Sequence, residues 1–155
     1  MLVLPAQGKI VFEPIAGEPM FECLILGDSI GVGAAKEINA RYARQCDVVA
    51  MVRATADQIL TWRRPFKSYG TCVFAIGSND EPGPALAAKL GRLRQPVVTR
   101  RVIWLLPYSR ERAYLVNSVA VRFGDETLDL MRFRSNDHVH PISYGDVADA
   151  LMGRR

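Results

Sequence analysis

The sequence predicts an α/β protein, a three-layer αβα sandwich in which helices cover both faces of a parallel sheet. The alternation of two kinds of segment along the chain indicates this class. Short, nearly continuous apolar runs alternate along the chain with longer segments of helical character. Strands buried on both faces of a parallel sheet have such continuous runs, whereas half-exposed antiparallel strands alternate with polar residues. The length of 155 residues suits one domain with a single core.

Five apolar runs fit strands of this sheet. In chain order they are Glu22–Leu26, Asp47–Val52, Thr71–Ile76, Arg101–Leu106 and Glu126–Leu130. Each precedes a segment that predicts a helix: Ile30–Arg44, Ala54–Arg63, Pro84–Leu93, a helix from Ser109 to about Arg122, and Ile142–Met152. Pro84 and Pro141 stand at first-turn positions, and Ser109 is a suitable N-cap. Five such units favour a flavodoxin-like five-stranded parallel sheet of order 2-1-3-4-5.

The first twenty residues differ from this pattern. Residues 1–20 contain the turn-formers Pro5, Gly8, Pro14 and Gly17. We interpret them as an N-terminal extension or small added hairpin, ahead of a single domain over residues 21–155.

Composition argues against several classes of partner. The net charge is +4, and the basic residues are scattered, whereas a nucleic-acid-binding surface needs a clustered basic stripe. No apolar run approaches the length of a membrane span, and the first residues lack the basic start of a secretory signal. The sequence therefore predicts a cytoplasmic protein that binds neither nucleic acid nor membrane.

The three cysteines cannot all pair within one chain. Cys23 and Cys72 lie in apolar runs, and Cys46 precedes another. We expect all three to be buried free thiols in a reducing compartment, where cysteine behaves as a small hydrophobe.

A serine follows the first predicted strand, in the segment Gly27-Asp28-Ser29. On a sharp strand-to-helix turn the hydroxyl of Ser29 is exposed and close to the positive end of a helix dipole. Taken alone, such a serine is more often a helix cap. The nearby Gly31-Val32-Gly33 does not complete a dinucleotide fingerprint, because Lys36 stands where glycine or alanine is needed.

Two further polar motifs follow later strands. The first of them, Gly77-Ser78-Asn79-Asp80, follows the third predicted strand. There Gly77 permits a tight turn, and Asn79 can direct its amide above the sheet. The alternative is an ordinary Asx turn. Asp137 and His140 lie three residues apart, directly before Pro141. Asp137 can there accept a hydrogen bond from Nδ1 of His140, which leaves Nε2 free to take a proton from a serine. His138 is one position out of phase and is expected to point elsewhere.

Together these motifs resemble the SGNH, or GDSL-like, hydrolase superfamily. The matching residues are Gly27, Asp28 and Ser29 in its first block, Gly77, Asn79 and Asp80 in its third, and Asp137, His140 and Pro141 in its fifth. The resemblance spans roughly residues 22–152. It implies that Ser29 is the nucleophile, that His140 is the general base and then acid, and that Asp137 orients His140, with Asp28 and Gly77 in support. It implies an oxyanion hole made by the Ser29 N–H, the Asn79 side chain and a backbone N–H of the second block, and neither a cofactor nor a metal.

The second block departs from the family pattern. Its usual glycine is replaced by Arg53, or by Ala54 if the register slips. Glycine permits close backbone approach and free choice of φ, although a backbone N–H survives substitution. Arg53 could point to solvent and retain this donor, or its guanidinium could bind a negatively charged substrate group.

The function that the sequence predicts is that of a serine esterase for small acyl esters, above all acetyl esters, including O-acetylated carbohydrates. The connections are short and offer no lid, which predicts a shallow, open site. One alternative is a lipid-directed esterase or thioesterase of lysophospholipase type. Another is a non-catalytic binding module of the same fold, for which residues 1–20 would be the partner-binding element.

Overall fold

A computed structural model describes residues 23–42, 46–65 and 68–153, and within them five parallel strands form one sheet of order β2-β1-β3-β4-β5. The strands are β1 (Cys23–Gly27), β2 (Asp47–Ala50), β3 (Thr71–Ala75), β4 (Arg101–Leu106) and β5 (Glu126–Asp129). The helices are α1 (Ser29–Arg41), α2 (Ala56–Leu60), α3 (Pro84–Arg94), α4 (Arg110–Phe123), the 3-10 helix η1 (Leu130–Arg132) and α5 (Tyr144–Leu151). The predicted fold class and strand order are confirmed.

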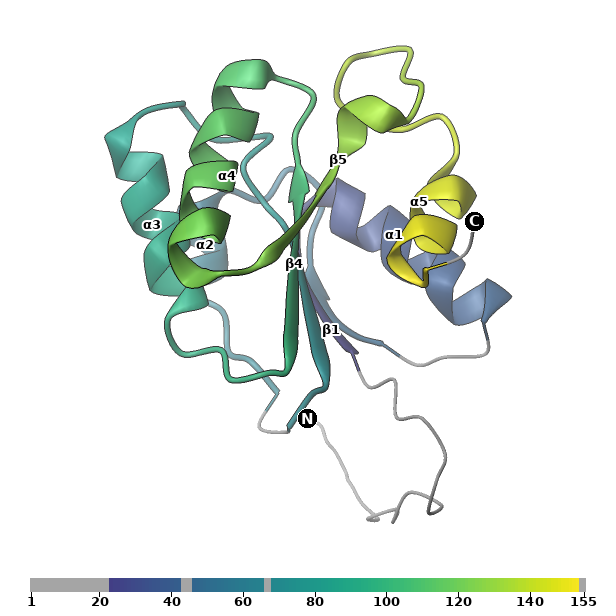
Figure 1. The fold of residues 1–155 in the computed structure, drawn as a ribbon, viewed down its shortest axis with the longest axis horizontal. Helices are drawn as coiled ribbons and strands as arrows, with labels where there is room; N and C mark the ends of the chain where they lie inside the picture. The colour runs from purple at the N-terminus through teal and green to yellow at the C-terminus, as the bar shows by residue number, and fades with distance from the viewer. Residues whose placement is uncertain (1–22, 43–45, 66–67, 154–155) are drawn as a thin grey trace.

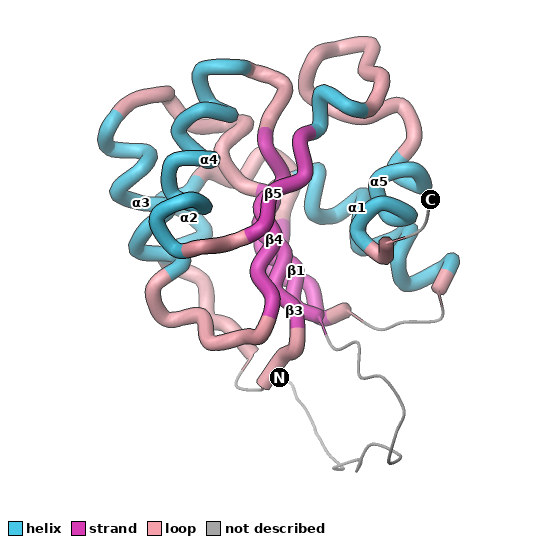
Figure 2. The backbone as a smooth tube through the Cα atoms, viewed as in Figure 1, coloured by secondary structure: helices cyan, strands magenta, loops and turns pink. Residues whose placement is uncertain are grey.

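The helices form the two outer layers. Helices α2, α3 and α4 cover one face of the sheet, and α1 and α5 cover the other (Figures 1 and 2). Leu24 and Leu26 of β1 pack into the first layer, and Cys23 and Ile25 pack into the second. Because every residue of β1 is buried on one face or the other, the strand is a continuous apolar run.

The second strand and helix are shorter than predicted. Strand β2 ends at Ala50 because the backbone then enters a turn, closed by the Ala54 N–H donating to the carbonyl of Met51 at 3.1 Å. Helix α2 starts at Ala56, where Thr55 is the N-cap and forms a capping box with Gln58.

The last helix also starts later than predicted. Ser143 is the N-cap of α5, and its hydroxyl accepts a hydrogen bond from the Asp146 N–H. Pro141 instead pairs with Ser135 in an isolated antiparallel bridge, so it ends the preceding loop and does not open the helix. A serine hydroxyl can accept a hydrogen bond from a free N–H group in the first turn of a helix, whereas a proline side chain has no such acceptor.

The expectation of three free thiols is wrong. Cys23 and Cys46 form a disulfide with a Cα–Cα distance of 4.7 Å, and Cys72 is the free, buried cysteine of the described residues. The parallel register explains the pair. Leu24 lies opposite Asp47 in the β1–β2 ladder, so the residues directly before them are adjacent as well.

Two findings bear on membranes and metals. Within the part of the chain that the structure describes, no helix combines the length and the apolar character needed to cross a bilayer. The same residues contain no group of three His, Cys, Asp or Glu side chains that could hold a metal ion. The predicted N-terminal extension, residues 1–20, lies outside the described residues.

Candidate active site

Ser29 is the first residue of α1, at the carboxyl end of β1. The helix cap is Asp28, whose Oδ1 accepts a hydrogen bond from the Ile30 N–H at 3.0 Å. The turn brings β1 very close to β3: the Asp28 N–H donates to the carbonyl of Ala75 at 2.9 Å, and a Cβ at Gly27 would overlap the same carbonyl. Because Asp28 caps the helix, the Ser29 hydroxyl is available for other partners.

Asp137 and His140 lie on the loop between η1 and α5. The bridge between Ser135 and Pro141 closes this loop. Oδ1 of Asp137 accepts hydrogen bonds from the backbone N–H groups of Val139 and His140 at 2.9 and 2.8 Å, and from the Ser135 hydroxyl at 3.1 Å. This leaves Oδ2 to meet Nδ1 of His140 at 2.8 Å. The loop thereby determines the orientation of the imidazole.

Ser29 and His140 meet across the fold. The Ser29 hydroxyl and Nε2 of His140 lie 2.8 Å apart, although 111 positions separate them in the sequence. Ser29, His140 and Asp137 thus form one hydrogen-bonded series. In such a series the imidazole can accept the hydroxyl proton while the carboxylate stabilises the imidazolium. The ring of His138 is not part of it: this residue is exposed, with φ +61°.

The two aspartates of the site differ in their electrostatics. The hydrogen bond with the His140 ring, aided by the His140 and Val139 N–H groups, holds the pKa of Asp137 well below its usual range. Burial instead raises the pKa of Asp28 to about 7, against the hydrogen bond from Ile30 and the charge of His140. Asp137 is therefore ionised over the whole physiological range, whereas Asp28 titrates near neutrality.

Asn79 lies beside the cap of α1. Its Nδ2 donates to the carbonyl of Ala54 at 3.0 Å and lies 3.5 Å from Oδ2 of Asp28. The turn that carries it begins at Gly77, whose φ of +120° strongly favours glycine. Asp80 ends the turn and joins it to α2, because its Oδ1 accepts a hydrogen bond from the Ala56 N–H at 2.9 Å. The structure thus brings the first and third motifs together.

Arg53 adopts a backbone conformation that favours glycine, with φ +67°. It lies within the turn from Met51 to Ala54. The Met51 N–H donates to the carbonyl of Gly27 at 3.1 Å, and the carbonyl of Ala54 accepts from Asn79. Hydrogen bonds therefore join one end of this turn to Gly27, two residues before Ser29, and the other end to Asn79. Among the described residues, the backbone N–H groups of Ser29 and Arg53 have no hydrogen-bond acceptor.

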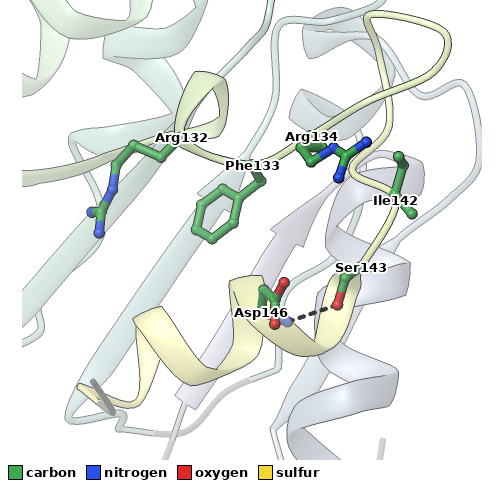
Figure 3. Close-up of a pocket in the computed structure, with 6 residues that line it drawn as sticks. All are labelled: Arg132, Phe133, Arg134, Ile142, Ser143 and Asp146. Carbon is green, nitrogen blue, oxygen red and sulfur yellow. Dashed lines mark hydrogen bonds between the residues drawn. The ribbon is translucent and has the colours of Figure 1, made fainter.

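A pocket of about 500 Å³ lies beside the His140 loop (Figure 3). Its lining residues come from η1 and the two ends of the loop together with the start of α5: Arg132, Phe133, Arg134, Ile142, Ser143 and Asp146. Neither Ser29 nor His140 lines it. The hydrogen-bonded series therefore lies outside this pocket.

Two supporting residues were not predicted from the sequence. Ser135 holds Asp137 and also accepts a hydrogen bond from the His138 N–H at 2.9 Å. The turn-forming run Ser135-Asn136-Asp137 was the available signal. Tyr144 lies against Gly33 of α1, where any Cβ would overlap its ring, and its electrostatic neighbours include Asp28 and Asp137. No sequence pattern marks that contact.

Comparison with known proteins gives a fold relationship. No protein-family model matches the chain, and no curated protein sequence matches it. Three solved structures align with it over most of its length. A protein described as an SGNH hydrolase, from Slackia heliotrinireducens, has a TM-score of 0.62 and 15% identity and covers 86% of this chain and 96% of its own. A protein described as lipolytic and of the G-D-S-L family, from Desulfitobacterium hafniense, has a TM-score of 0.64 and 13% identity, with 85% and 98% covered.

The third is a carbohydrate esterase family 2 enzyme with a carbohydrate-binding domain, from Corynascus thermopiles (Myceliophthora fergusii). Its TM-score is 0.63 at 16% identity, and the alignment covers 92% of this chain and 69% of that one. At such identities the likeness concerns the fold. The structural neighbours of this chain are SGNH and GDSL-family hydrolases and esterases, and their fold is the fold of this protein.

Proposed function

We propose that this protein is a serine esterase that hydrolyses small acyl esters, acetyl esters in particular. The observation that carries the proposal is the hydrogen-bonded series from Ser29 through His140 to Asp137, with 2.8 Å at each step. Ser29 comes from the start of α1, whereas His140 and Asp137 come from the loop before α5, where Asp137 accepts the backbone N–H groups of Val139 and His140. The SGNH esterase fold supports the same assignment.

The proposed reaction proceeds in two steps. Oγ of Ser29 attacks the ester carbonyl while His140 takes the hydroxyl proton, and this proton then passes to the departing alcohol. The resulting acyl-serine is attacked by water, whose proton His140 accepts and returns to Oγ as the acid leaves. Asp137 keeps the imidazole in the required tautomer and stabilises its cationic form.

The oxyanion needs donors that are not engaged elsewhere. The backbone N–H groups of Ser29 and Arg53 meet this requirement among the described residues, and Ser29 lies at the positive end of α1. Asn79 is the third proposed donor. Its Nδ2 carries two protons, one donated to the carbonyl of Ala54 at 3.0 Å and the other to Oδ2 of Asp28 at 3.5 Å, so the proposal requires the oxyanion to replace the longer of these two hydrogen bonds.

The first experiment compares Ser29→Ala with the wild-type protein on 4-nitrophenyl acetate, butyrate and octanoate. We expect Ser29→Ala to lose at least about 1000-fold in kcat, as loss of a triad member does. Ser118→Ala, which removes an exposed hydroxyl from α4, is the matched control. Covalent labelling of Ser29 by a fluorophosphonate, read by mass spectrometry, tests the nucleophile directly. Equal rates for wild type and Ser29→Ala, with no labelling, would leave a non-catalytic module as the explanation.

Acyl-chain length and carrier define the substrate class. A preference for acetate supports the small-ester proposal, whereas rates that rise steeply from butyrate to octanoate would indicate a lipid-directed esterase. The likeness to a carbohydrate esterase supports O-acetylated carbohydrate as the carrier. Acetate release from an acetylated oligosaccharide, absent with Ser29→Ala, is the outcome that we expect.

A further inference from the structure

Arg53 retains an unfavourable backbone conformation next to the candidate site. A φ of +67° is readily adopted by glycine but costs an arginine on the order of 1 kcal/mol. No contact in the turn accounts for this choice, because Arg53 is exposed and has no ion pair or side-chain hydrogen bond with any described residue. Strain of this kind at a functional site points to a role for the side chain.

The position of the turn limits where this cation can act. Met51 is bonded to Gly27, two residues before Ser29, and Ala54 is bonded to Asn79. Arg53 lies between these two anchored positions, so its backbone is at the edge of the site. No described acid pairs with it. Asp28 and Asp80 are buried and accept hydrogen bonds from the Ile30 and Ala56 N–H groups, and Asp57 pairs with Lys89 at 2.9 Å.

We propose that Arg53 is a specificity-determining residue that favours esters carrying a carboxylate near the acyl group, such as an acetylated acidic carbohydrate. This inference rests on the proposed esterase function. An exposed guanidinium beside the site attracts an anionic carrier and can bind a carboxylate through two parallel N–H donors. The chemistry of the acyl transfer is unchanged, and the gain is in binding.

The test uses two esters with the same acetyl group and ring, 4-acetoxybenzoate and its neutral analogue 4-acetoxybenzamide. The quantity compared is kcat/KM for the anionic ester divided by kcat/KM for the neutral ester. We expect this ratio to be about fivefold lower in Arg53→Asn than in wild type, mainly because KM for the anionic ester rises, as the loss of an exposed ion pair predicts. Asparagine tolerates positive φ and preserves the backbone N–H, so the fold and the donor remain. Arg53→Lys keeps the charge but loses the paired donors, so it should retain part of the ratio. About 0.5 M NaCl should reduce the difference between variants.

Arg100→Asn is the matched control, because Arg100 is also exposed but directly precedes β4, at the amino end of the strands, whereas Arg53 follows β2 at their carboxyl end. An unchanged ratio in Arg53→Asn, or an equal fall in Arg100→Asn, would overturn the inference. If wild type hydrolyses neither ester, the esterase proposal itself has failed. In that event, the affinities of both esters are measured by NMR titration with and without Arg53→Asn: an anionic preference that depends on Arg53 supports the inference, and its absence rejects it.

Discussion

Nδ2 of Asn79 lies 3.5 Å from Oδ2 of Asp28, a carboxyl with no exposed surface that also caps the helix beginning at Ser29. A neutral amide and a buried acid therefore share one corner of the candidate site. Since burial raises the pKa of Asp28 to about 7, the charge at this corner changes near neutral pH.

Asp28→Asn should change the pH dependence of stability. The folded pKa of Asp28 is about 7 against an ordinary value of 3.8, so the folded state binds more protons between these values, and stability falls as pH rises from about 4 to 7. The shift in pKa corresponds to about 4 kcal/mol of stability, and the weaker hydrogen bonds of asparagine at this position offset part of the gain.

We expect Asp28→Asn to be more stable than wild type at pH 8, by about 1 to 4 kcal/mol, and to lose this advantage by pH 4. Urea denaturation at both pH values measures this, with the exposed Glu81→Gln as control; parallel pH profiles for wild type and Asp28→Asn would contradict it.

Asp137→Asn should impair catalysis without unfolding the loop. Asparagine can still accept the Val139 and His140 N–H groups but cannot stabilise the imidazolium. We expect kcat to fall by about 1000- to 10,000-fold with little change in KM. Asp146→Asn, a change of the same type in the first turn of α5, should leave kcat within about twofold of wild type. A similar loss in both variants would point to a general effect of charge.

Asn79→Ala should lose one oxyanion donor. We expect kcat to decrease by about 100- to 1000-fold while substrate affinity changes little, because the interaction strengthens only as the oxyanion develops. Ser78→Ala, the preceding residue of the same turn, is the control. If KM rises and kcat does not fall, Asn79 binds the ground state and has no role in the oxyanion hole.

The disulfide should be detectable by counting thiols. In non-reducing denaturant, one thiol per chain should react, that of Cys72, and three should react after reduction. A crosslink over 23 positions stabilises by about 3 kcal/mol in the chain-entropy model, and Cys46→Ala should lose this amount relative to oxidised wild type. Under reducing conditions, wild type and Cys46→Ala should have similar stability. Three reactive thiols in the unreduced protein would show that the pair is free.

The fold class, the strand order and the residue types of the three polar motifs could all be predicted from the amino-acid sequence. Continuous apolar strands carry this information locally, because burial on both faces leaves no polar position within the strand. Ser29, Asn79 and His140 became candidates because each lies within three residues of a predicted element, and parallel topology collects such positions at one end of the strands. Their proposed roles rested on the resemblance to a hydrolase family.

Features that depend on strand register and on long-range contacts could not be predicted in this way. The pairing of Cys23 with Cys46 follows from the β1–β2 register, which no local pattern specifies. The late start of α5 follows from the bridge that occupies Pro141. The 2.8 Å contact between Ser29 and His140 likewise needs β1, α1 and the final loop to be assembled. Single residues can indicate a chemistry, but only packing sets the distances on which that chemistry depends.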